Sequence, residues 1–164
     1  MSDHKIIIGA IVNNQFGVLM RITELFTKRC YNIDSLEVGV TDDPAYSRMT
    51  IVATGDASVE EQIIKQLSKL HDVRHAAIIP TERASVREHM LIKLKVAPNT
   101  NAALTAMINA RGAKVIDFSA ETITAEVTGE VESNDGFIEC AREFGILEIC
   151  RAGAQALHRG TECL

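Results

Sequence analysis

The residues from Asn13 to Leu19 are the part of the chain best suited to bind a small ligand. They lie between an apolar run at 6–12, typical of a buried strand, and a segment whose apolar residues recur at helical spacing. The first turn of a helix carries unpaired backbone N–H groups and a partial positive charge, and Gly17 has no side chain to cover them. The segment therefore predicts a site for a carboxylate or a phosphate, although a simple strand-to-helix turn capped by asparagine would have the same residues.

Catalytic and metal-binding patterns are scarce in the sequence. Among the five histidines, only His71 and His75 have i, i+4 spacing, and that pair straddles the end of an expected helix. No glycine-rich dinucleotide or phosphate-loop pattern occurs, so we expect no catalytic residue, no metal site and no intrinsic cofactor. The four cysteines form no Cys-x-x-Cys pair and are expected to be free thiols, which leaves an enzyme with Cys30 or Cys150 as its nucleophile as an open alternative.

The composition is that of an ordinary globular chain, with 164 residues, 46% of them hydrophobic and 24% charged. The formal net charge of −5 argues against binding to nucleic acid or to an anionic membrane. No apolar run approaches the roughly 20 residues that span a bilayer, and the N-terminal residues have no secretory or transit pattern. We therefore expect a cytoplasmic protein.

The hydrophobic periodicity repeats one order of elements twice: strand, helix, strand, strand, helix, strand. The first copy is expected at 5–12, 18–29, 33–41, 46–54, a helix capped by Ser58, and 73–79. The second copy is expected at 90–96, 102–111, 114–120, 122–129, 133–144 and 146–154. The pattern predicts an α+β fold of two ferredoxin-like βαββαβ sandwiches, with one domain at 1–80, a linker at 81–87 and a second domain at 88–164.

A unit of this kind leaves one face of its sheet and two edge strands uncovered, and about 80 residues is a marginal size for independent stability. Pairing of edges between two chains would cover them. We therefore expect a homodimer or a larger oligomer, formed through the strand at 33–41 and the helix before it.

The same order of elements occurs in RNA-binding domains that stack bases on the aromatic side chains of their sheet. Aromatic residues make up only 4% of this chain, and the net charge is negative, so RNA binding is excluded. The loop of the second unit that corresponds to Asn13–Leu19, at 97–101, has no glycine and contains Pro98, which lacks an N–H. The ligand should therefore prefer the first unit.

Several motifs follow one another at characteristic separations. Asn14-x-x-Gly17-x-Leu19-x-Arg21 is followed by the sequence RCYNIDSL at 29–36, by TDD at 41–43, by SRMTI at 47–51 and by RAGAQALHRG at 151–160. In this order the motifs resemble the regulatory (small) subunit of acetolactate synthase, also called acetohydroxyacid synthase. The similarity runs from about Lys5 to Gly160.

The resemblance implies an N-terminal ACT domain and a second, ACT-like domain. It implies that ACT domains pair side by side, with the feedback inhibitor valine at their interface. The implied partner is the large catalytic subunit, which uses thiamine diphosphate, Mg²⁺ and FAD to condense pyruvate with pyruvate or 2-oxobutanoate in the biosynthesis of valine, isoleucine and leucine. The small subunit would raise the activity of that partner and confer inhibition by valine.

The resemblance and the glycine loop indicate the same site. The N–H groups around the glycine would hold the carboxylate of the amino acid, two asparagines would hold its polar atoms, and a small apolar wall would contact the isopropyl group. The expected effector-binding residues are Asn14, Gly17, Val18, Leu19, Asn32 and Ile33. An alternative role for Asn32 is to cap the turn after the first helix.

Three residues depart from the family pattern. Cys30 stands where glycine is usual, which predicts a strained or missing left-handed helix end. Met20 replaces a small residue and Asn13 an acidic one, so the choice among valine, isoleucine and leucine stays open. Besides the cysteine-dependent enzyme, a free-standing amino-acid sensor with a different partner is the other alternative.

Overall fold

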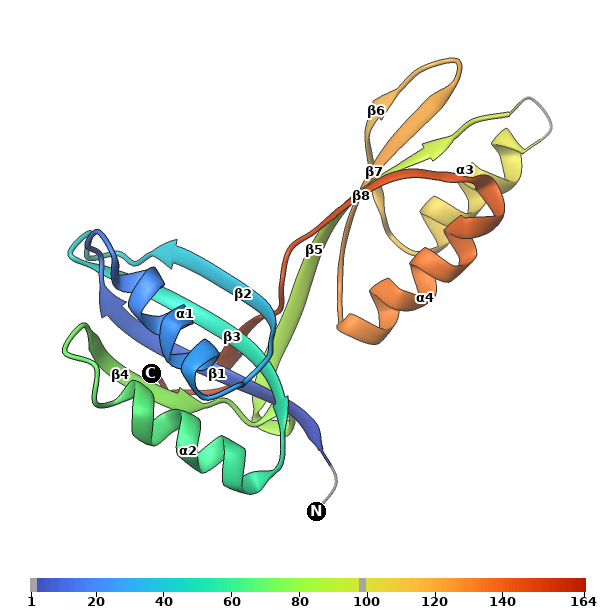
Figure 1. The fold of residues 1–164 in the computed structure, drawn as a ribbon. Helices are drawn as coiled ribbons and strands as arrows, with labels where there is room; N and C mark the ends of the chain where they lie inside the picture. The colour runs from blue at the N-terminus through green and yellow to red at the C-terminus, as the bar shows by residue number, and fades with distance from the viewer. Residues whose placement is uncertain (1–2, 98–99) are drawn as a thin grey trace. The chain divides into compact units, whose positions relative to one another are not determined.

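The computed structural model describes residues 3–97 and 100–164, which form two units. The first unit is Met1–Val86 together with Gly153–Leu164, and the second is Arg87–Ala152. Each contains an antiparallel sheet with two helices on one face (Figure 1). The expected α+β fold of two ferredoxin-like βαββαβ sandwiches is confirmed.

The first sheet has the strand order β2-β3-β1-β4, so that β2 and β4 are its edges. In chain order the elements are β1 (His4–Asn13), α1 (Val18–Lys28), β2 (Ile33–Val40), β3 (Tyr46–Gly55), α2 (Ala57–Leu67) and β4 (Val73–Ile78). The alternation of strand residues sends Ile6 and Ile8 of β1 toward the helices, where they pack with Ile22 and Phe26 of α1 in one buried cluster. The predicted elements agree closely with these bounds.

One helix start differs from the prediction. The cap of α2 is Asp56, whose carboxylate accepts hydrogen bonds from the N–H groups of Ser58 and Val59, both at 3.0 Å. Ser58 lies inside the first turn instead. An aspartate at this place also carries the negative charge that the helix dipole favours, which a serine lacks.

The second sheet has the order β6-β7-β5-β8. Its elements are β5 (Ala84–Lys95), α3 (Asn101–Ala110), β6 (Lys114–Phe118), β7 (Thr122–Gly129), α4 (Val131–Ala141), a 3₁₀ turn η2 (Arg142–Phe144) and β8 (Ile146–Arg151). Residues from both helices and three strands share its core, among them Met90, Ile92, Leu104, Ile108 and Phe137.

The outer face of the first sheet is covered by the chain itself, which differs from the expected domain boundaries. Residues 81–87, expected as a linker, form a 3₁₀ turn η1 (Thr81–Arg83) and the start of β5. Residues 153–164, expected in the second domain, belong to the first unit and contain a short strand, β9 (Gln155–His158), that pairs with β5. We call residues 153–164 the C-terminal strap.

The C-terminal strap is held to the first sheet by apolar and polar contacts. Ala156 lies in a buried cluster with Ile7 of β1, and Leu164 packs against that cluster. A Cβ on Gly9 would clash with the tip of the Leu164 side chain, so glycine allows the strap to lie close to the sheet there. The guanidinium of Arg48 on β3 donates to the carbonyl of Ala156 at 2.7 Å. The outer face of this sheet is therefore part of the core.

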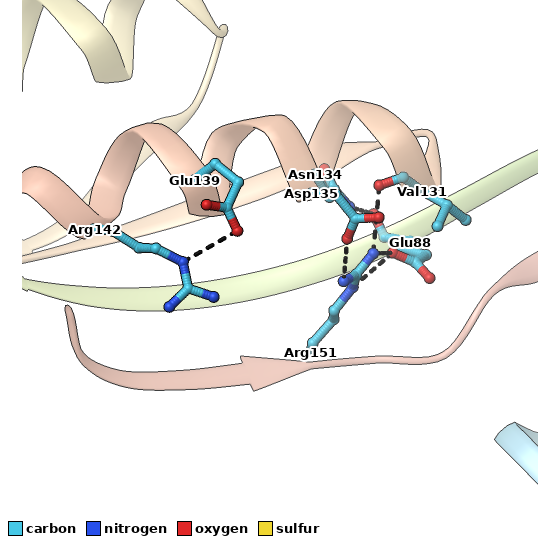
Figure 2. A network of polar contacts seen from close by, with 7 residues as sticks. All are labelled: Glu88, Val131, Asn134, Asp135, Glu139, Arg142 and Arg151. Atoms are coloured by element: carbon cyan, nitrogen blue, oxygen red, sulfur yellow. Dashed lines mark hydrogen bonds and ion pairs between the residues drawn. The ribbon is translucent and has the colours of Figure 1, made fainter.

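A polar network fixes one end of the second unit (Figure 2). Arg151, at the end of β8, donates through Nε to the carboxylate of Glu88 on β5 at 2.7 Å and through Nη1 to Asp135 on α4 at 2.7 Å. Asn134, fully buried beside them, donates to the carbonyl of Glu88 at 3.4 Å. Because Glu88 is itself buried, its charge depends on Arg151 for compensation.

Candidate functional site

The loop between β1 and α1 is held in place on both sides. The N–H of Asn13 donates to the carbonyl of Asp72 at 2.8 Å, and the N–H of Asn14 donates to the carbonyl of Ala45 at 2.8 Å. The side-chain amide of Asn14 adds a bond to the carbonyl of Pro44 at 3.0 Å. The loop thus lies against two neighbouring turns, and these three hydrogen bonds hold its conformation.

Gly17 is the N-cap of α1 and has a left-handed backbone, with φ +82° and ψ −5°. No side chain caps the helix, and no acidic residue lies in its first turn. Among the described residues, none accepts a hydrogen bond from the N–H of Gly17, Leu19 or Met20. The N–H of Val18 makes one long bond, 3.4 Å, to the carbonyl of Gln15. The helix start therefore offers unpaired donors at the position that the sequence indicates.

One arginine lies at this helix start, and a second contacts the end of β1 just before the loop. The Nη1 atom of Arg21 lies 3.0 Å from the position that a Cβ on Gly17 would take, and its Nε donates to Asp72 at 2.7 Å. That hydrogen bond from Arg21 holds the pKa of Asp72 below its ordinary value. Arg74 donates to the side-chain oxygen of Asn13 at 2.9 Å. The guanidinium of Arg21 therefore lies beside the unpaired donors with its charge shared with Asp72, and its remaining N–H groups are donors suited to an anionic ligand.

Polar and apolar groups for the rest of a ligand are also present. The Oδ1 atom of Asn14 accepts no hydrogen bond within the described part of the chain, so it is free to accept one from a ligand. Leu19 and Met20 are exposed at the first turn of α1, whereas the side chain of Val18 is buried in the core. Val18 can therefore contact a ligand only through its backbone.

The structure separates the six predicted residues into two groups. Asn14, Gly17, Val18 and Leu19 lie at the start of α1, and Asn32 and Ile33 follow its end. An 11-residue helix is roughly 16 Å long, so one chain does not bring the two groups together. The amide of Asn32 donates to Asp34 at 2.8 Å, and Ile33 packs against the core.

Asp34, the partner of Asn32, belongs to a small charged cluster. It accepts a hydrogen bond from Nζ of Lys5 at 2.8 Å and one from the hydroxyl of Thr54 at 2.7 Å. The bond from Lys5 is the main reason why the pKa of Asp34 lies below its ordinary value of 3.8. This cluster orients Asn32 at the end of α1.

The left-handed end of α1 is present despite the missing glycine. Cys30 has φ 58°, and in the described part of the chain it is the one residue other than glycine with positive φ. Its N–H donates to the carbonyl of Thr27 at 3.1 Å, and the N–H of Tyr31 donates to that of Phe26 at 3.0 Å. These two bonds define a Schellman motif, so the end is strained and not absent.

Sequence reasoning identified the loop but not all of its surroundings. The salt bridge from Arg21 to Asp72 joins residues 51 positions apart, and no local pattern indicates it. The corresponding loop of the second unit includes Pro98 and Asn99, which lie outside the described residues. No group of three or more metal-ligating side chains occurs at 3–97 or 100–164, and no helix there is long and apolar enough to cross a membrane.

The chain matches known families along most of its length. Residues 8–75 match the ACT domain of the kind found in AHAS small subunits, and residues 87–160 match the family described as the small subunit of acetolactate synthase. The acetolactate synthase small subunit of Bacillus subtilis is 42% identical over 160 residues, which are 96% of this chain and 92% of that protein. The chain belongs to the acetolactate synthase small-subunit family.

Further comparisons support the same assignment. A probable acetolactate synthase small subunit of Methanothermobacter thermautotrophicus is 38% identical over 159 residues, covering 96% of this chain and 95% of that protein. The crystal structure of the acetolactate synthase small subunit of Thermotoga maritima superposes with a TM-score of 0.91 at 30% identity, covering 97% of this chain and 99% of that one. As an acetolactate synthase small subunit the chain is a regulatory subunit, and its family implies a catalytic subunit as its partner.

Proposed function

We propose that this small subunit activates the catalytic subunit of acetolactate synthase and makes it sensitive to feedback inhibition by valine. The observation that carries the proposal is the start of α1, where a left-handed Gly17 leaves backbone donors unpaired beside Arg21. A small amino acid has the carboxylate that such donors bind. The family assignment supplies the context, branched-chain amino-acid biosynthesis.

The loop has a group for each part of valine. The N–H groups of Gly17 and Leu19 would bind the carboxylate, with that of Val18 joining if its long bond to Gln15 opens. The Oδ1 atom of Asn14 would accept a hydrogen bond from the ammonium group. Leu19 would contact the isopropyl group. Isoleucine and leucine differ from valine by one methylene, which pockets distinguish by only about 1–3 kcal/mol.

A second copy of the chain would complete the site. β2 is an edge strand with Val38 and Val40 exposed, 48% and 61%, on the side of the sheet that carries α1. If a two-fold axis relates the two chains across this edge, β2 of one chain runs antiparallel to β2 of the other, and the two copies of α1 also run antiparallel to each other. The start of α1 in one chain then faces the end of α1 in the other. Asn32 and Ile33 of the partner would thus approach Gly17, which explains why one chain keeps the two groups apart.

The chemistry of the synthase would reside on the catalytic subunit. Thiamine diphosphate, Mg²⁺ and FAD are proposed to bind there, and this chain would contribute regulation without catalysis. We also propose that the complex is cytoplasmic. Pyruvate consumption by the purified small subunit alone would contradict this division of roles.

Reconstitution with the catalytic subunit tests the proposal. We expect the mixture to turn over faster than the catalytic subunit alone and to lose activity as valine is added. Failure to bind any catalytic subunit while still binding valine would identify a free-standing sensor instead. Alkylation of the thiols should leave both effects intact, since no cysteine takes part.

The interface is tested with a matched pair of variants at one exposed position. Val38→Lys places two positive charges, one from each chain, close together across the two-fold axis, where they repel each other. Val38→Thr keeps the branched shape of valine and adds no charge. We expect Val38→Lys to weaken valine inhibition at least tenfold and Val38→Thr to change it little. Equal inhibition in the two variants would exclude β2 as the interface that completes the site.

A further inference from the structure

The second unit has an exposed edge strand of its own, β6. All five of its residues are exposed, including Val115, Ile116 and Phe118 at 40%, 47% and 58%. An edge strand presents unpaired backbone groups, here together with apolar side chains, that can template pairing with another strand. No proline interrupts it.

The helix beside β6 has an equally unusual surface. α3, with the sequence NAALTAMINA, contains no charged residue, and its exposed positions include Ala102, Ala103, Ala106 and Ala110. By contrast, α1, α2 and α4 each carry at least three charged side chains. Depletion of charged residues is typical of the centre of a protein–protein interface.

A bulge brings the two charges of β6 to one face of the sheet. Lys114 pairs with Glu126 of β7, and Asp117 pairs with Thr124, with the register shifting between Val115 and Asp117. Glu126 and Thr124 are two residues apart on β7 and therefore point to the same face. Lys114 and Asp117, although three residues apart, must then share that face as well, because the bulge adds one residue between them.

This arrangement selects a single register for antiparallel pairing of β6 with its own copy. Residues opposite each other in an antiparallel pair point to the same face. If the two-fold axis passes between Val115 and Ile116, Lys114 of each chain lies opposite Asp117 of the other. Shifting the register by one residue in either direction sets Lys114 against Phe118 or Ile116, which loses both charge pairs.

We propose that β6 and α3 form a second self-association surface, occupied by the same edge of a second copy in the register that pairs Lys114 with Asp117. This surface lies in the second unit and does not depend on the valine site. Lys114 also disfavours partner strands that would set a cation opposite it, because like charges directly opposite each other repel.

Disulfide cross-linking of the full-length chain tests the register. In a background with the four native cysteines replaced by serine, we would mix Lys114→Cys with Asp117→Cys. The two thiols lie opposite each other in the proposed register and should form a mixed disulfide. Each variant alone serves as the control, since like positions are about 10 Å apart along the strand, beyond the roughly 7 Å limit for a disulfide. Equal yields in the mixed and separate samples would overturn the proposal.

A charge-swap experiment tests the energetics and excludes simple misfolding. In a dimer of Asp117→Lys alone, a lysine lies opposite a lysine at both paired positions. In a dimer of Lys114→Glu alone, a glutamate lies opposite an aspartate at both paired positions. Mixed together, the two variants form pairs with opposite charges at both positions. We expect amide exchange at 114–118 to be at least tenfold faster in each variant alone than in the parent, and protection to return on mixing.

Two results would overturn self-pairing by β6. One is slow exchange at 114–118 that is the same in every variant and mixture. The other is protection that appears only when the catalytic subunit is added, which would identify that subunit as the occupant. Neither result bears on valine inhibition, so the proposal can fail without the proposed function failing.

Discussion

Replacement of Gly17 by aspartate or by asparagine separates the role of charge from the role of shape at the proposed valine site. The two side chains have nearly the same size, and both tolerate a left-handed backbone such as the φ +82° seen here. Either Cβ would lie 3.0 Å from Nη1 of Arg21, a flexible side chain that can move aside. The backbone penalty of about 1 kcal/mol applies to both variants and cancels in their comparison.

The expected difference comes from the carboxylate. An aspartate at position 17 would set a carboxylate beside the unpaired N–H groups of the helix start, including that of Leu19, and would repel the carboxylate of valine. Each charge-assisted hydrogen bond that the ligand loses is worth about 1.5–3 kcal/mol. Loss of one or two such bonds weakens binding on the order of a hundredfold for Gly17→Asp. Gly17→Asn adds no charge and should weaken binding by about tenfold or less.

The assay is activity of the reconstituted complex across a valine titration, together with calorimetry of valine binding to the small subunit. Circular dichroism and activation of the catalytic subunit without valine are the controls, and both should stay as in the parent. Unchanged inhibition in a folded Gly17→Asp variant would show that this loop is not the effector site. An equal and large loss in both variants would show that shape, and not charge, decides binding.

Three further substitutions probe the physical account of the fold. Cys30→Gly should raise the free energy of unfolding by about 0.5–1 kcal/mol in urea, because the relief of left-handed strain exceeds the added entropy cost of glycine. Asp34 has a folded pKa below its unfolded value of 3.8, so its ion pair stabilises the fold above that pH and is lost as the pH falls below it. Thermal unfolding of Asp34→Asn should accordingly depend less on pH between about 5 and 3 than that of the parent. Arg151→Met leaves the buried Glu88 without compensation and should destabilise the second unit by about 2–3 kcal/mol, and adding Glu88→Gln should recover part of this loss.

The sequence was sufficient to predict the order of elements because apolar spacing is a local pattern, and burial of those apolar residues in the core stabilises the elements that the pattern predicts. The alternation of Leu36, Val38 and Val40 predicted β2, and the register confirms that Leu36 and Val38 lie opposite the buried Ile51 and Met49. The prediction that Ser58 caps α2 was wrong because Asp56 and Ser58 are both good capping residues and lie only two positions apart. Local signals of this kind do not rank two candidates so close together.

What the sequence could not reveal depends on contacts between distant residues. In the C-terminal strap, the small residues Ala154 and Ala156 become buried only because they pack on the first unit. At the candidate site, Gly17 was predicted from its neighbours, since the loop and the helix start are adjacent. The partners that surround it, Asp72 and Arg74, come from the start of β4 and have no pattern that links them to the loop.

The C-terminal strap has a consequence for how the chain folds during synthesis. Residues 153–164 leave the ribosome only after 87–152 have been made, a delay on the order of several seconds at about 5–20 residues per second. Throughout that interval the first sheet can form its helix-covered side, but on its other face Ile7 and Ile79 lack the cover that Ala156 and Leu164 provide. Folding of the first unit is therefore divided into two stages by the translation of the second. A nascent chain that stalls before Gly153 would carry an exposed apolar sheet face, the form most open to chaperones and to aggregation.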